Sequence, residues 1–223
     1  ALGIREGHAR LTLLLSEAAT IWADVVVAAD RGDFWLIADG RSEAELQARL
    51  RGARLPGDDV SCLSAGAEYA LLAIDGPRAP AFLEANGFAG LSGMASHTLA
   101  WLDDDVRCIR VSRTGEFGYW LLVPRAAAAG MWDRLTLAAP RLSRDDQAHA
   151  ALEAGVFNIH VDALAALTPL ELHLQWRVSR DRHRVNGMAA LVARVAAPDR
   201  RRIVGLRGAH LRGAIELDGA HVG

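Results

Sequence analysis

The stretch from Val111 to Pro124 (VSRTGEFGYWLLVP) constrains the fold of this chain more than any other. It places the carboxylate of Glu116 between Gly115 and Gly118, and residues typical of strands lie on both sides. Alternating and apolar runs of this kind predict β-strands, and the two glycines allow the backbone to turn between them. We therefore predict a β-hairpin that presents an acid at its turn.

The chemistry of that acid leaves two interpretations open. A carboxylate that is held in place accepts two N–H donors side by side, which suits a flat heterocycle with an amino-amidine edge, such as a pterin. An ordinary solvated glutamate in a turn explains the same residues, because turn signals are common and binding sites are few.

Composition excludes several classes of function. The chain has 223 residues, 51% hydrophobic, with a net charge of -2, which fits a soluble globular protein without an electrostatic footprint for nucleic acid or an anionic membrane. It contains no lysine, which excludes a Schiff base and a Walker-type phosphate loop. Cys62 and Cys108 form neither a metal-spaced pair nor a disulfide framework. No apolar run approaches membrane-spanning length, and the expected location is the cytoplasm.

Hydrophobic periodicity and turn residues predict an α+β fold with antiparallel sheets and helices packed on them. The predicted strands are Leu11–Leu15, Ile21–Ala28, Phe34–Ala38, Tyr69–Ile74, Thr98–Trp101, Val106–Ser112 and Tyr119–Val123. The predicted helices are Ser42–Leu50, Pro77–Asn86, Ala126–Leu137 and Ser143–Glu153, with Ser42 and Ser143 as N-caps.

Asp24 is the anomaly among the predicted strands, because it is a carboxylate within an apolar run. Alternation places it on the face opposite Val25 and Val27. An unpaired buried carboxylate is prohibitively costly, so Asp24 must face solvent, a partner or a ligand. From the residues alone, an edge-strand aspartate that points to water stays open.

The sequence does not predict a metal centre. His160 and Asp162 are potential ligands, but no third group follows at a suitable spacing. Asp103 to Asp105 are adjacent acids in a predicted turn, whereas a calcium loop needs alternating ones. The arginine-rich runs at 177–184 and 200–202 are typical of solvated loops.

Five segments, in order along nearly the whole chain, resemble the motifs L-x-x-Q-G-P-x-A, S-x-T-G-E-x-G-Y, L-R-x-E-x-G, T-P-x-E-x-x-L-x-W and R-R-x-V-G-L. They are Leu72–Ala79, Ser112–Tyr119, Leu152–Gly155 with Asp162, Thr168–Trp176 and Arg201–Leu206. Together they are similar to the aminomethyltransferase family, which includes the folate-binding T-protein of the glycine cleavage system and the folate domains of sarcosine and dimethylglycine dehydrogenases.

The resemblance implies a T-protein-like fold of two antiparallel-sheet domains. It assigns residues 1–65 and 141–198 to a discontinuous folate-binding domain 1, residues 66–140 to an α+β domain 2, and residues 199–223 to the start of a C-terminal β-barrel. Relatives usually continue at both ends, so this chain is expected to be unusually short or to lack its ends.

The resemblance also implies tetrahydrofolate as cofactor. It gives Asp24 the role of catalytic acid or base beside the folate nitrogens, and Glu116 that of holding the pterin edge. The further residues that it places at the cofactor are Asp39, Arg113, Tyr119 and Trp176. Three positions depart from the family: Ala23 replaces a second acid, Asp39 replaces asparagine, and Ala151 replaces an arginine.

The implied function is transfer of a one-carbon unit, aminomethyl or methyl, to tetrahydrofolate. The partners would be the folate, an amine or methyl donor and a lipoyl carrier protein, and the arginine-rich runs could attract a folate glutamate tail or an acidic carrier. The alternative is a non-catalytic folate-binding or regulatory module that has lost part of the active site, and a structural protein without a ligand ranks last. The donor is not readable from the sequence.

Overall fold

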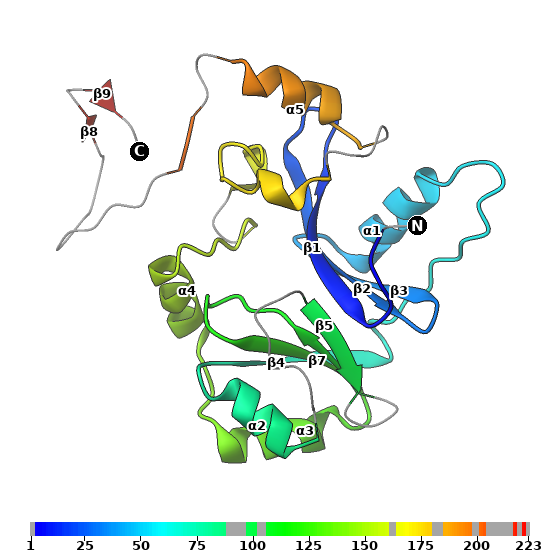
Figure 1. The fold of residues 1–223 in the computed structure, drawn as a ribbon, viewed down its shortest axis with the longest axis vertical. Helices are drawn as coiled ribbons and strands as arrows, with labels where there is room; N and C mark the ends of the chain where they lie inside the picture. Colours follow the sequence, from blue (N-terminus) through cyan, green and yellow to red (C-terminus); the bar gives the residue numbers. More distant parts are fainter. Residues whose placement is uncertain are drawn as a thin grey trace.

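The computed structural model describes residues 3–87, 97–101, 106–160, 164–179, 185–197, 201–203, 216–217 and 220–221 (Figure 1). Its strands are β1 His8–Leu15, β2 Ile21–Asp30, β3 Asp33–Asp39, β4 Tyr69–Asp75, β5 His97–Trp101, β6 Arg107–Arg110, β7 Gly118–Pro124, β8 Glu216–Leu217 and β9 Ala220–His221. Its helices are α1 Glu43–Gly52, α2 Ala79–Ala85, α3 Ala128–Ala138, α4 Arg144–Glu153 and α5 Met188–Val195, with 3-10 helices η1 Leu164–Ala166 and η2 Gln175–Arg177.

Seven strands form one antiparallel sheet in the order β3-β2-β1-β5-β6-β7-β4. The mixture of helices and antiparallel strands predicted from the sequence is therefore confirmed. The two predicted sheets are joined edge to edge, because His8 and Ala9 at the start of β1 pair with Thr98 and His97 of β5. The predicted domain boundaries stay a prediction.

Two helices begin at predicted caps. The Ser42 hydroxyl accepts a hydrogen bond from the backbone N–H of Glu45, whose carboxylate accepts one from the Ser42 backbone. Ser143 and Asp146 form the same capping box at α4. Each box satisfies N–H groups that the first helical turn leaves without partners, which contributes about 1 kcal/mol per cap.

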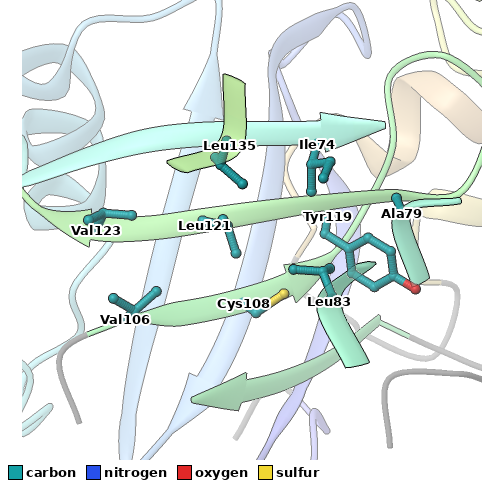
Figure 2. Packing of buried hydrophobic residues seen from close by; sticks show 9 residues of the cluster. All are labelled: Ile74, Ala79, Leu83, Val106, Cys108, Tyr119, Leu121, Val123 and Leu135. Atoms are coloured by element: carbon teal, nitrogen blue, oxygen red, sulfur yellow. The ribbon is translucent and has the colours of Figure 1, made fainter. Parts of the chain in front are cut away.

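The first core cluster lies between one face of β4, β6 and β7 and helices α2 and α3. Figure 2 shows Tyr119, Leu121 and Val123 projecting from β7 on this side, with Leu83 of α2 beside the Tyr119 ring. Cys108 is fully buried here, and burial raises the pKa of its thiol, so it behaves as a small core residue.

A second cluster covers the opposite face of the same strands. Trp120 and Leu122 alternate with the residues of the first cluster along β7, and they pack with Ile109 against Val26 and Ala28 of β2. Strands β6 and β7 therefore lie between helices on one side and the β1–β3 half of the molecule on the other. This arrangement brings the β6–β7 turn close to β2.

Ion pairs also cross between these two parts. The Nε of Arg107 on β6 donates to the Oδ2 of Asp30 on β2 at 2.7 Å, and the guanidinium lies 4.1 Å from the centre of the Trp35 ring on β3. Both charged side chains are largely buried, and their hydrogen bond adds a directional contact to the apolar packing between the two parts.

The third cluster lies at the far end of β1 and β2, where residues 164–179 and helix α5 lie beside the first strands (Figure 1). Leu13, Leu15 and Ile21 pack here against Leu172 and Leu191. The backbone N–H of Ile21 also donates to the carbonyl of Leu167 at 3.2 Å. These contacts pack residues from the second half of the chain against the first two strands.

Several predictions fall outside the described residues. These are the acids Asp103 to Asp105, Asp162, and most of the predicted start of a β-barrel, of which the structure describes only the short hairpin β8–β9. Among the helices that are described, none combines the length and apolar character needed to cross a membrane.

Candidate functional site

Asp24 lies at the centre of the candidate site. It is 1% exposed, and the strand register places it opposite Leu13 of β1 and Asp39 of β3. Opposed residues in antiparallel strands share a face, so Asp24 and Asp39 point to the same side of the sheet. Ala23, where the resembling family has a second acid, is buried on the other face with Val25.

Two arginines bind both carboxylate oxygens of Asp24. Its Oδ2 accepts from the Nη1 of Arg113 at 2.8 Å and from the Nη1 of Arg177 at 3.2 Å, while its Oδ1 accepts from the Nη2 of Arg177. Burial alone raises the pKa of Asp24, but the hydrogen bonds from Arg177 and the charges of both arginines outweigh it and lower the pKa. Asp24 is therefore a paired, ionised carboxylate at neutral pH.

Arg113 connects Asp24 to the predicted hairpin. It lies in the turn between β6 and β7, and its Nη2 is also 3.9 Å from the Oδ2 of Asp39. Its guanidinium lies 5.4 Å from the centre of the Trp120 ring, which helps to fix its direction. Asp39 is 39% exposed, so the charged cluster extends from the buried Asp24 to the surface.

Arg177 lies 153 positions after Asp24 in the sequence. It belongs to η2, and only 8% of it is exposed. Its Nη2 donates to the carbonyl of Thr12 at 3.3 Å, and the Thr12 hydroxyl donates to the carbonyl of Arg177 at 3.3 Å. Sequence reasoning missed Arg177 because it begins a basic run of a kind that is usually solvated. The available signal was Asp24 itself, which as a buried acid requires a cation.

The turn before η2 is fixed by a buried glutamate. The carboxylate of Glu171 accepts from the backbone N–H of Thr168 at 2.8 Å and from its hydroxyl at 2.9 Å. Burial would raise the pKa of Glu171, but these bonds and Arg201 lower it. The T-P-x-E motif is thus a self-capped turn, and η2 after it brings Arg177 to Thr12 of β1 and Asp24 of β2.

Trp176 lies at the edge of the cluster. It is 67% exposed, and the guanidinium of Arg177 is 6.0 Å from its ring centre. The structure therefore brings Trp176 next to the charged cluster and leaves a flat aromatic surface open to solvent. Such a surface suits stacking of a planar ligand.

The predicted hairpin is confirmed, since β6 and β7 pair in antiparallel register around the turn that carries Glu116. Glu116 is exposed. Gly115 has a φ of 77°, and a Cβ on it would lie 2.2 Å from the Cβ of Ala154, so only glycine fits. Helix α4 packs its C-terminal end against this turn.

Tyr119 is not brought together with the other predicted residues. Its side chain is fully buried in the first core cluster (Figure 2). The neighbouring Trp120 projects from the opposite face of β7 and contacts Arg113 instead. Successive side chains of a strand point to opposite faces, and sequence alone does not tell which face meets the site.

His160 lies near the surface end of the cluster. A Cβ on Gly40, which follows Asp39, would be 2.0 Å from the His160 ring, so the ring packs directly on this glycine. Within the described residues, the buried Nε2 of His160, the Nε of Arg177 and the Oε1 of Gln175 have no hydrogen-bond partner. The described part of the chain contains no group of three or more residues suited to hold a metal.

The cluster combines alternating charges with buried polar atoms that have no hydrogen-bond partner among the described residues. Asp39, Arg113, Asp24 and Arg177 form a chain of opposite charges from the surface to the core. Asp24 orients the two guanidiniums, because both of its oxygens already accept hydrogen bonds. The arrangement suits binding of a polar, planar ligand more than proton transfer by Asp24.

Comparisons with known proteins agree with the architecture. The family model described as the GCVT N-terminal domain matches residues 2–182. The chain is 29% identical over 212 residues to an aminomethyltransferase of Mycobacterium avium, a match that covers 92% of this chain and 57% of that protein. It is 29% identical over 211 residues to an aminomethyltransferase of Frankia alni, covering 91% of this chain and 57% of the relative.

A solved structure shares the fold. The glycine cleavage system aminomethyltransferase T from Bartonella henselae superposes with a TM-score of 0.69 at 21% identity, over 86% of this chain and 54% of that one. The chain thus spans a little over half the length of the relatives that it matches. Since the family model covers most of the residues, this chain belongs to the family of the GCVT N-terminal domain.

Proposed function

We propose that this chain is the folate-binding part of a tetrahydrofolate-dependent one-carbon transferase of the aminomethyltransferase type. Family membership supports folate-dependent chemistry at a general level. One observation carries the proposal for this chain. Arg113, three residues from Glu116, forms an ion pair with Asp24 and so couples the acid-bearing turn to the buried charged cluster.

The residues present suit a folate. Glu116 is an exposed carboxylate acceptor for the N–H groups of a pterin edge, and Trp176 offers an exposed aromatic face. Among the described residues, the Nε of Arg177 and the Oε1 of Gln175 are buried without a hydrogen-bond partner, and both lie beside Trp176 in the sequence. A bound tetrahydrofolate would supply the nitrogen nucleophiles that accept a one-carbon unit.

The proposal gives Asp24 a different role from the catalytic one expected at first. A carboxylate whose oxygens both accept from guanidiniums, and whose pKa is lowered, is a poor proton carrier near neutral pH. Asp24 therefore positions Arg113 and the buried Arg177, and Arg113 with Glu116 is the part of the cluster placed to meet the ligand. Asp39, 39% exposed, is the acid available at the surface to a cationic donor group.

Partner and donor belong to the same proposal. An amine or methyl donor, free or delivered on a lipoyl carrier protein, would supply the one-carbon unit. The exposed arginines of the C-terminal part, such as Arg201 and Arg202, give an acidic carrier a complementary surface.

The proposal is tested by anaerobic titration calorimetry of tetrahydrofolate. We expect Glu116→Ala to weaken binding by about tenfold or more, because a charged hydrogen-bond acceptor is lost. Glu153→Ala removes an equally charged, exposed side chain at the end of α4 and serves as the matched control, with unchanged binding expected. Undetectable binding to the parent chain and to both variants refutes the folate assignment.

A second measurement separates transfer from binding alone. With tetrahydrofolate bound, isotope-labelled donors of each class are added, and formation of methylene- or methyl-tetrahydrofolate is followed in a single turnover. Product formation supports the transferase. Binding without product from any donor class favours the non-catalytic folate module.

A further inference from the structure

Asp75, at the end of β4, contacts the acid-bearing turn at several points. Its Oδ1 accepts from the hydroxyl of Ser112 at 2.8 Å and from that of Thr114 at 3.2 Å. The two hydroxyl oxygens are 3.1 Å apart, and the backbone N–H of Thr114 donates to the Ser112 hydroxyl at 3.0 Å. The two residues that flank Arg113 are therefore tied to one carboxylate.

The far end of the turn is fixed to the same place. The backbone N–H of Gly76 donates to the carbonyl of Phe117 at 2.8 Å. A Cβ on Gly118 would lie 2.3 Å from the Oδ1 of Asp75, so the carboxylate occupies space that any other residue would fill. Asp75 and Gly76 thus hold both the beginning and the end of the turn.

The network extends to Glu116 itself. The hydroxyl of Thr114, which is 96% buried as a residue, accepts from the backbone N–H of Glu116 at 3.4 Å while it donates to Asp75. A chain of hydrogen bonds therefore leads from Asp75 through Thr114 to the backbone of Glu116. Burial raises the pKa of Asp75, and the hydrogen bonds from Ser112 and Thr114 offset this only in part.

We propose that Asp75 is a positioning residue for the candidate folate site. By holding the backbone on both sides of Arg113, it lets that arginine reach Asp24 and sets the direction in which Glu116 projects. The inference rests on the proposed function for the identity of the ligand. The conformational stability of the turn itself can be measured by hydrogen exchange without any ligand. Asp75 stands where the family-like motif L-x-x-Q-G-P has glutamine, and its two hydroxyl donors suit an acceptor at this position.

The test pairs ligand binding with hydrogen exchange of the free protein. Asp75→Asn keeps an acceptor oxygen, whereas Asp75→Ala removes it. In the absence of ligand, we expect amides 112–118 to exchange about tenfold faster in Asp75→Ala, because two hydrogen bonds are lost, and peptides of α3 to be unchanged. Asp75→Asn is expected to stay within about threefold of the parent in exchange and in tetrahydrofolate affinity.

Further variants keep the test informative if Asp75→Ala does not fold. Thr114→Val removes only the hydroxyl, and we expect it to loosen the turn and weaken binding in the same direction. Asp133→Ala, an exposed acid on α3, is the matched control without effect. Equal exchange of the turn in the parent, Asp75→Ala and Thr114→Val overturns the positioning role.

The outcomes separate this inference from the proposed function. If the turn exchanges faster in Asp75→Ala but the parent binds no tetrahydrofolate, Asp75 does hold the turn and the folate assignment is wrong. Binding by the parent that Asp75→Ala and Thr114→Val leave unchanged sustains the folate site and refutes the inference. Loss of binding in Asp75→Ala with recovery in Asp75→Asn supports both.

Discussion

The buried cluster around Asp24 allows a quantitative test of how this domain is held together. Replacing Asp24 by leucine leaves the guanidiniums of Arg177, 8% exposed, and Arg113, with 15% of its side chain exposed, without their shared carboxylate. Removing one partner of a buried ion pair typically costs about 3–5 kcal/mol of unfolding free energy. For a chain of this size that loss lowers Tm by roughly 6–20 °C.

The single variant alone does not isolate the pairing, so we expect the decisive result from a double-mutant cycle. Arg177→Met keeps an unbranched apolar side chain of similar reach, and an apolar pair often replaces a buried ion pair without net loss. Asp24→Leu combined with Arg177→Met should therefore be more stable than Asp24→Leu alone. Arg113 keeps Asp39 within 3.9 Å as a remaining partner in that double variant.

The assay is urea unfolding at pH 7, followed by tryptophan fluorescence, of the parent, both single variants and the double variant. A coupling energy of about 2 kcal/mol or more between positions 24 and 177 is expected for groups in direct buried contact. Additive effects, or a loss below about 1 kcal/mol for Asp24→Leu, would show that the ion pair contributes little. Either result would refute the reasoning from burial.

Three further predictions follow from single contacts. The arginines lower the pKa of Asp24 below its ordinary 3.8, so the stability that ionised Asp24 adds to the fold is present above that pH and is lost as the pH falls through the lower folded pKa. Arg177→Met removes one of these cations, and acid unfolding followed by circular dichroism should therefore shift to higher pH. Gly118→Ala should cost about 1–3 kcal/mol in urea unfolding, since its Cβ would meet Asp75 at 2.3 Å. Gly130→Ala, at an exposed position of α3 with nothing within 4 Å, should instead stabilise by about 0.5–1 kcal/mol. Thr168→Val should cost about 1–3 kcal/mol by leaving the buried Glu171 short of one donor, and an unchanged denaturation midpoint would contradict this.

Local features were the most predictable from the sequence. The strands, both N-caps and the hairpin around Glu116 depend on residues close in the chain, and the structure confirms them. The need of Asp24 for a partner also followed from the cost of burying a lone charge. These inferences use only alternation, capping chemistry and desolvation.

Contacts between distant residues were the features that the sequence did not show. Arg177 lies 153 positions from Asp24, and nothing in its own neighbourhood distinguishes it from the solvated arginines that follow it. Tyr119 was selected because it belongs to a motif, but the packing of helices α2 and α3 decides that its side of β7 is the core side. The hydroxyls that bind Asp75 likewise come from residues 37 and 39 positions away in the chain.

The edge-to-edge junction of the sheet has a consequence for precision at the site. In the described part of the chain, the pairing of β1 with β5 joins His8 to Thr98 and Ala9 to His97, so two residue pairs connect the two halves of the sheet there. Apolar packing between them is non-directional and would tolerate sliding. The ion pairs of Arg107 with Asp30 and of Arg113 with Asp24 are directional, because a planar guanidinium bonds a carboxylate in few orientations. The alignment of the halves, and with it the distance between the acid-bearing turn and β2, is thus encoded in two charged side-chain contacts.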